Sequence, residues 1–114
     1  MFKIDLSPSY WWPVRFNLPK ETGGTQETYT FDVEYKRMTL SESEALGRRA
    51  EVEKLSDAAI AAEMVIGWKG VADGTGAPVP FSEAALRRAL DTPNVAAAVV
   101  STFFESNARA SSKN

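Results

Sequence analysis

The sequence contains no cysteine and no histidine. No disulfide framework can form, and thiol chemistry is excluded. The two gaps also remove the Cys and His ligands of zinc sites, the Ser–His and Cys–His nucleophile pairs, and the side chain best suited to proton transfer at neutral pH. These absences weakly favour a binding or assembly role over catalysis, and we expect neither a metal nor an organic cofactor.

The chain also lacks an excess of basic residues and a long hydrophobic run. Its 13 Lys and Arg residues face 15 Asp and Glu residues, which gives a formal net charge of -2. Affinity for nucleic acid comes largely from cationic contacts to phosphate, so we expect no nucleic-acid partner. The longest apolar stretch, 95–104, is about half the length that crosses a bilayer, and the N-terminus has no apolar segment of secretory length. We therefore expect a cytosolic protein with no membrane partner.

What is present is enough for one domain with a modest core. The 114 residues are 44% hydrophobic and 25% charged, close to the globular average. We expect residues 1–114 to form a single domain, with an ordered core over about 10–108 and a flexible polar tail over 109–114.

Two N-terminal segments show the period-two alternation of strands. In the first, every second residue is apolar: Trp12, Val14, Phe16 and Leu18. Pro13 cannot donate to a ladder, so this strand should lie at a sheet edge or begin at a bulge. In the second, aromatic and aliphatic residues alternate with threonine or charged residues: Tyr29, Phe31, Val33 and Tyr35. Such alternation is typical of antiparallel strands with one wet face, and the pair should form a hairpin.

The rest of the chain predicts helices. Ser41 and Glu44 fit a capping box, and an apolar stripe follows at three- and four-residue spacing, so we expect a long helix over about 42–66 that Gly67 ends. Residues 68–81, rich in glycine and proline, should form an irregular connector. Ser82 should cap a short helix to Leu90, and a last helix should run over about 93–107. The fold class is therefore α+β: a small N-terminal antiparallel β-hairpin or sheet packed on about three helices, one long, one short and one C-terminal.

The segment Asp73-Gly74-Thr75-Gly76 is the closest approach to a catalytic motif. It invites comparison with the Asp-Thr-Gly of aspartic proteases, but the residue order differs and only one copy is present. The plainer interpretation is turn chemistry, in which Asp-Gly supplies a positive φ.

Exposed aromatic residues are the better candidates for function. Trp11 and Trp12 are adjacent in a strand and should face opposite sides, so one can anchor a partner unless the first residues of the chain fold over it. Phe103 and Phe104 pose the same question on the last helix, where a core position is favoured. A two-stranded hairpin also leaves an edge that another chain can pair with, which predicts a homo-oligomer. The candidate interface residues are Trp11, Trp12, Val14, Phe16, Phe103 and Phe104.

A family resemblance rests on a series of turn and spacing residues over roughly 27–114. These are Trp68-Lys69-Gly70-Val71, Asp73, Gly76, Pro78-Val79-Pro80-Phe81-Ser82, Leu86, Leu90, Pro93, Val95, Phe103-Phe104 and Lys113-Asn114. The pattern resembles the tail assembly chaperones of long-tailed bacteriophages. The Trp11-Trp12 segment lies outside it.

The resemblance implies a small protein of the infected host's cytoplasm that is absent from the mature virion. It would bind the long, apolar, helical tape-measure protein and keep it soluble during tail-tube assembly, with the tail-tube protein as a further candidate partner. Self-association is also implied. Two alternatives stay open: a minor structural virion protein of the tail or the head-to-tail joint, and an enzyme that relies only on carboxylates.

Overall fold

The computed structural model describes residues 1–108 and is an α+β fold, as predicted. Three strands form one antiparallel sheet in the order β1-β2-β3: β1 (Ser9–Pro19), β2 (Gln26–Lys36) and β3 (Val65–Lys69). Four helices complete the described part: α1 (Leu40–Val52), α2 (Asp57–Ala62), α3 (Glu83–Leu90) and α4 (Val95–Asn107). The predicted flexible tail, 109–114, lies outside the described residues.

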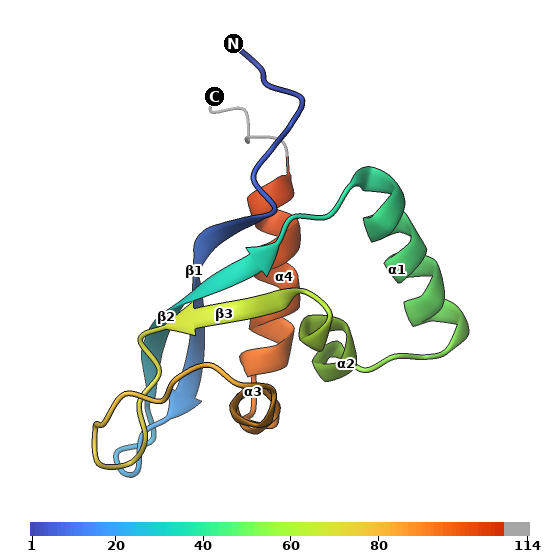
Figure 1. The fold of residues 1–114 in the computed structure, drawn as a ribbon. Helices are drawn as coiled ribbons and strands as arrows, with labels where there is room; N and C mark the ends of the chain where they lie inside the picture. The colour runs from blue at the N-terminus through green and yellow to red at the C-terminus, as the bar shows by residue number, and fades with distance from the viewer. Residues whose placement is uncertain (109–114) are drawn as a thin grey trace, which may run out of the picture.

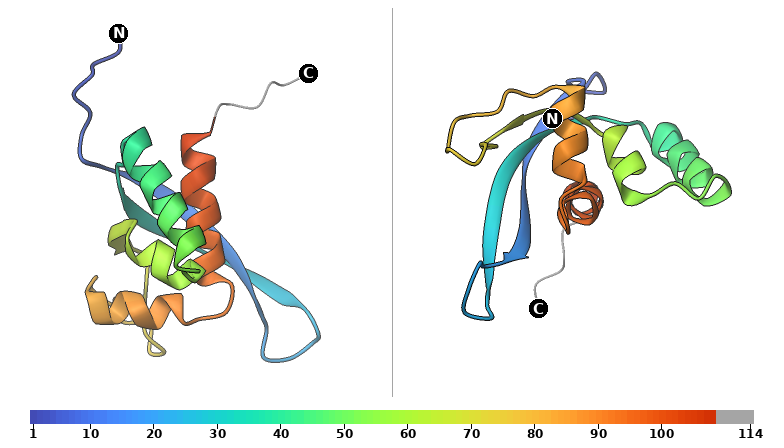
Figure 2. Two further views of the ribbon diagram at one scale, coloured as in Figure 1. Left: turned by 90° about the vertical axis from the view of Figure 1, so that its right-hand side faces the viewer. Right: turned by 90° about the horizontal axis from the view of Figure 1, so that it is seen from below.

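The helices lie on one side of the sheet, and the other side is open (Figures 1 and 2). The expected alternation along both N-terminal strands is confirmed, because Val14 pairs with Phe31 and the side chains of Val14, Phe31, Val33 and Tyr35 all enter the core. Trp12 and Tyr29, predicted on the same buried faces, are exposed instead. From the helical side, the core is completed by Leu46, Ala61, Met64, Leu86, Leu90, Val95, Val99 and Phe103. The outer face carries the exposed polar set, as expected for an antiparallel sheet wetted on one side.

The prediction of one long helix over 42–66 is wrong, because this segment forms α1, α2 and the start of β3. The chain leaves the helical conformation at Lys54, which has φ 53°, and Ser56 then caps a separate short helix by accepting from the Ala59 N–H at 3.1 Å. The segment after α2 becomes β3, because the edge of β2 beside it offers free backbone groups that Val65–Lys69 can pair with. The sheet therefore has three strands instead of the predicted two.

Helix starts also differ in detail from the prediction. The capping box at α1 joins Thr39 and Glu42, two residues before the predicted pair: the Glu42 N–H donates to Thr39 Oγ1 at 3.1 Å, and the Thr39 N–H donates to Glu42 Oε1 at 2.9 Å. Ser82 caps α3 as predicted, accepting from the Ala85 N–H at 3.0 Å. The last helix begins at Val95, two residues after the predicted start.

Trp68 and Gly67 are strand residues, not the connector and the helix stop that we predicted. Gly67 lies opposite Glu34 in the sheet, and a Cβ at this position would come within 2.6 Å of Glu34 Oε1. Ser9 Oγ holds the same carboxylate by donating to Glu34 Oε2 at 2.6 Å. The glycine is therefore explained by a close approach across the outer face of the sheet.

Candidate functional site: an apolar groove beside alpha 3

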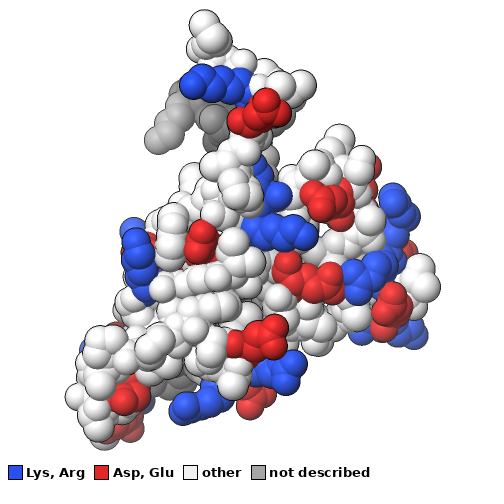
Figure 3. All heavy atoms as spheres, in the orientation of Figure 1, with Lys and Arg blue, Asp and Glu red and all other residues white. Residues whose placement is uncertain are grey.

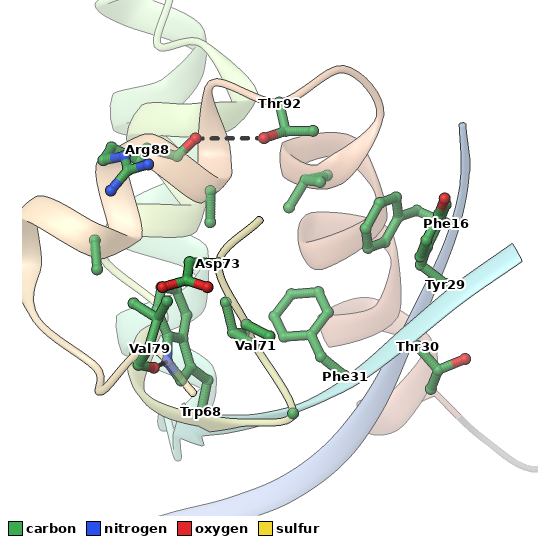
Figure 4. A pocket seen from close by; sticks show the side chains of 15 residues that line it. Phe16, Tyr29, Thr30, Phe31, Trp68, Val71, Asp73, Val79, Arg88 and Thr92 are labelled. Atoms are coloured by element: carbon green, nitrogen blue, oxygen red, sulfur yellow. Dashed lines mark hydrogen bonds between the residues drawn. The ribbon is translucent and has the colours of Figure 1, made fainter. Parts of the chain in front are cut away.

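An open groove of about 350 Å³ lies between the far half of the β1–β2 hairpin, the 70–79 loop and α3. Its walls are mostly apolar, and Figure 4 shows Phe31 and Val71 pointing into it, with Asp73 and Arg88 on the side of the loop and α3. Its apolar lining includes Phe16, Phe31, Trp68, Val71, Ala85 and Ala89. A volume of this size suits a small ligand or a few side chains of another chain.

A row of aromatic contacts builds the floor of the groove. The Phe16 ring packs edge-on against Phe31 with a centroid distance of 6.0 Å, and Phe31 packs edge-on against Trp68 at 6.5 Å. Trp68 in turn contacts Phe81 at 5.3 Å and donates its indole N–H to the Val79 carbonyl at 2.8 Å. The indole thus fixes the returning limb of the 70–79 loop against the sheet.

Asp73 shapes the tip of the loop. Its Oδ1 accepts from the Thr75 hydroxyl at 2.6 Å, the Thr75 N–H at 2.8 Å and the Ala77 N–H at 3.1 Å. These hydrogen bonds, with a smaller contribution from the charge of Arg88, lower the pKa of Asp73 below its usual 3.8. The carboxylate therefore works as a turn-forming group, and the positive φ of 85° falls at Gly76, not at Gly74. The turn interpretation of this segment holds, with the left-handed residue moved by two positions.

The predicted interface residues separate into three groups by burial. Val14 and Phe103 are buried in the core, so the prediction that they belong to an interface is wrong. Val14 is on the inner face of β1, and Phe103 is on the inner face of α4. Phe16 is half-buried and lines the groove. Trp11, Trp12 and Phe104 are exposed, at 43%, 41% and 57% of their surface.

The two tryptophans do face opposite sides of the sheet, but neither is in the core. Trp12 lies on the inner face, edge-on to Tyr10 with centroids 6.5 Å apart. Trp11 lies on the outer face beneath the Lys69 ammonium, 4.3 Å from the ring centroid, a favourable cation–π geometry. The first residues of the chain do not fold over them, because Phe2, Ile4 and Leu6 are themselves exposed.

The free edge along β1 is a poor template for pairing with another strand. At the two ends of the hairpin, the Lys20 N–H donates to the Thr25 carbonyl and the Arg37 N–H donates to the Pro8 carbonyl. Even-numbered residues of β1 therefore form hydrogen bonds with β2, and odd-numbered residues direct their backbone groups to the free edge. β1 lies at an edge of the sheet, as Pro13 predicted. Pro13 is one of the odd-numbered residues that face this edge, and it has no backbone N–H to donate to an incoming strand. The edge carbonyls of Ser9 and Asn17 accept from Ser7 Oγ at 3.1 Å and Asn94 Nδ2 at 2.7 Å. Such interruptions discourage edge-to-edge association.

Sequence reasoning named only Phe16 among the groove residues as a candidate for binding. The groove combines residues from all three strands, the 70–79 loop, α3 and the start of α4, and no local pattern brings these together. One signal was present, because Trp68, Val79 and Phe81 stand out as large apolar residues in a segment otherwise rich in glycine and proline.

Residues 1–108 contain no cluster of three or more Asp or Glu side chains placed to hold a metal ion. None of the helices in this described part is long and apolar enough to cross a membrane. Figure 3 shows acidic and basic side chains interspersed over the visible face, with no field of one sign. No family model matches the chain, and no curated protein or solved structure matches it either.

Proposed function

We propose that this protein is a bacteriophage tail assembly chaperone that holds an apolar segment of the tape-measure protein during tail-tube assembly. It acts in the cytoplasm of the infected host and is absent from the mature virion. The tail-tube protein is its second partner, and the role is one of binding, not catalysis. The observation that carries the proposal is the apolar groove beside α3, which is open to solvent while its walls are held by hydrogen bonds.

The dimensions of the groove favour contact with a few side chains at a time. At about 350 Å³ it accepts part of one apolar stripe of a helix, not a whole helix. Amphipathic helices are commonly bound in this way, through anchors spaced three or four residues apart. A contact this small gives weak and reversible binding, which suits a chaperone that must leave when the tube closes around its client.

The mixed surface charge supports the same role. A net charge of -2 keeps a small protein soluble without attracting it to nucleic acid. Trp12 and Phe104 add exposed aromatic surface outside the groove, and large aromatic residues are frequent anchors in protein interfaces.

Co-expression with the tape-measure protein of the same phage tests the proposal. We expect most of the tape-measure protein to be soluble when the chaperone is present and insoluble when it is absent. Ala85→Glu places a carboxylate in the groove and should lower the soluble fraction several-fold. Ala84→Glu is the matched control, because Ala84 is the exposed neighbour on α3 and carries the same helix-terminal charge effect.

Two results would contradict the proposal. One is a tape-measure protein whose solubility is the same with and without this protein. The other is the detection of this protein in purified virions by mass spectrometry at one or more copies per particle, which would favour the alternative of a minor structural component.

A further inference from the structure

The first six residues form an arm whose apolar side chains are largely exposed. Phe2, Ile4 and Leu6 are exposed at 77%, 82% and 54%. Two hydrogen bonds hold the base of the arm: Arg37 Nε donates to the Ser7 carbonyl at 2.9 Å, and the backbone N–H of Arg37 donates to the Pro8 carbonyl at 2.9 Å. The arm leaves the molecule at the end of the sheet opposite the 70–80 loop (Figure 1).

The arm has the pattern of a strand with one apolar face. Its apolar residues occupy alternate positions, and Lys3 and Asp5 stand between them. In an extended chain Phe2, Ile4 and Leu6 face one side while both charges face the other. A strand of this kind is stable only when a sheet edge pairs with its backbone and an apolar surface covers one face.

The groove offers both features. Pairing between β2 and β3 ends where Asp32 meets Lys69, although β2 starts six residues earlier at Gln26. The even residues of β2 direct their N–H and C=O groups away from β1, so Thr28 and Thr30 present theirs beyond the end of β3. Within residues 1–108 no backbone hydrogen bond is made to this exposed half of β2 on that side.

The side-chain directions of arm and groove agree. If Lys3 and Asp5 lie opposite Thr28 and Thr30, the alternate residues of the arm face the groove, whose lining includes Phe31, Val71 and Ala85. The two charges then join the polar outer face of the sheet. There Arg15 pairs with Thr30, and Asp32 follows two residues along β2, so the outer face beside the arm carries charges of both signs.

The arm cannot reach this docking position in its own molecule. The position lies beside Thr28 and Thr30, and Thr30 pairs with Arg15, which is about 20 Å along β1 from Ser9 at ~3.3 Å per residue. Asp5 is separated from Ser9 by a chain that spans at most about 14 Å, so it falls short of both threonines. The arm can therefore pair with Thr28 and Thr30 only when they belong to another molecule.

We propose that two copies of this protein exchange their arms, each arm adding as a strand beside Thr28 and Thr30 of the partner and inserting Phe2, Ile4 and Leu6 into its groove. Such an exchange is reciprocal and closed, which yields a symmetric dimer. Both arms and both grooves contribute to the buried surface. The total is on the order of the ~1,200 Å² at the lower limit of specific interfaces, given that one phenylalanine alone buries ~150–250 Å².

The dimer does not depend on the proposed function, but it bears on it. An arm that occupies the groove covers the surface assigned to the tape-measure protein, so the dimer is the form without client. A variant without the apolar arm residues should therefore be monomeric and should still keep the tape-measure protein soluble. Loss of the dimer with retained client binding separates this proposal from the chaperone proposal.

Sedimentation velocity at tens of micromolar tests the exchange. We expect the wild-type protein to be a dimer, and the variant Phe2→Ser, Ile4→Ser, Leu6→Ser to be a monomer with an unchanged circular dichroism spectrum. The control Lys3→Ser, Asp5→Ser changes the same arm on its polar face and should remain a dimer. A monomeric wild type, or a serine variant that stays dimeric, would overturn the proposal.

The absence of native cysteine allows a second test of the geometry. A chain carrying Ile4→Cys and Ala85→Cys should form a disulfide-linked dimer under mild oxidation, because the two positions meet only between copies. A chain carrying Ile4→Cys and Ala84→Cys should form several-fold less, since Ala84 faces away from the groove. Equal cross-linking in the two chains, or only intramolecular disulfides, would contradict the docking site.

Discussion

Removal of one buried hydroxyl tests the account of how α4 is held on the sheet. Tyr35 is fully buried, and its Oη donates to the Val99 carbonyl of α4 at 2.8 Å. Its ring lies 5.6 Å from the rings of both Tyr10 and Phe103, centroid to centroid. Tyr35→Phe keeps these ring contacts and removes only the hydrogen bond. Because the Val99 carbonyl then stays buried without a donor, the free energy of unfolding should fall by about 1–2 kcal/mol. Domains of this kind typically have a free energy of unfolding of only ~5–15 kcal/mol.

The same hydroxyl predicts a characteristic pH dependence. Burial raises the pKa of Tyr35 well above its usual 10. Above pH 10 the unfolded chain loses this proton while the folded chain keeps it, so the free energy of unfolding falls as pH rises, by about 1.4 kcal/mol per pH unit. The phenylalanine variant lacks this contribution. The stability difference between the two proteins should therefore be largest near pH 8 and should shrink toward zero near pH 11.

Urea unfolding followed by tryptophan fluorescence measures both effects. At pH 8 we expect a lower urea midpoint for the variant, and in thermal melts a Tm lower by roughly 4–8 °C for each kcal/mol lost. Equal midpoints at pH 8 would refute the hydrogen bond between β2 and α4. A stability difference that stays constant from pH 8 to pH 11 would refute the assigned pKa shift.

Three further changes test other parts of the fold. Thr39→Ala should lower stability by about 1 kcal/mol in urea unfolding, while Ser41→Ala should have almost no effect, because only Thr39 caps α1. Gly70→Ala should cost about 1–2 kcal/mol in the same assay, since its φ of 84° is unfavourable for residues with a Cβ. The hydrogen bond from Arg49 lowers the pKa of Glu63 below its usual 4.5, so the stabilisation is present above this value and is lost as pH falls through the folded-state pKa. In Glu63→Gln, the free energy of unfolding should therefore fall less steeply as the solution is acidified. An unchanged pH dependence below pH 4.5 would contradict the ion pair.

How far a prediction held depended on how local its cause was. β2 was predicted with its correct faces because alternation alone reports which side of a strand is buried. Ser82 was correctly placed as a cap because a side chain and an N–H three residues later are sufficient to form one. The prediction for residues 65–69 failed for the opposite reason: their apolar run suits either a helix or a strand, and the outcome depends on β2, which lies 30 or more residues earlier in the chain.

The candidate site shows the same division. The aromatic and glycine-rich composition of 68–81 could be read directly, but the groove exists only because Trp68 reaches the Val79 carbonyl and folding places α3 across from the far half of the hairpin. The apolar alternation of residues 2–6 was likewise visible in the sequence. The tertiary structure decided that the arm projects from one end of the sheet and that the docking position beside Thr28 and Thr30 lies beyond its reach at the other end.

By itself the sequence determined the fold class, the strand faces and the absence of cysteine and histidine chemistry, since these depend on composition and on neighbours in the chain. The third strand, the groove and the exposed half of β2 depend on distant segments that meet only on folding, so the tertiary structure alone decided them.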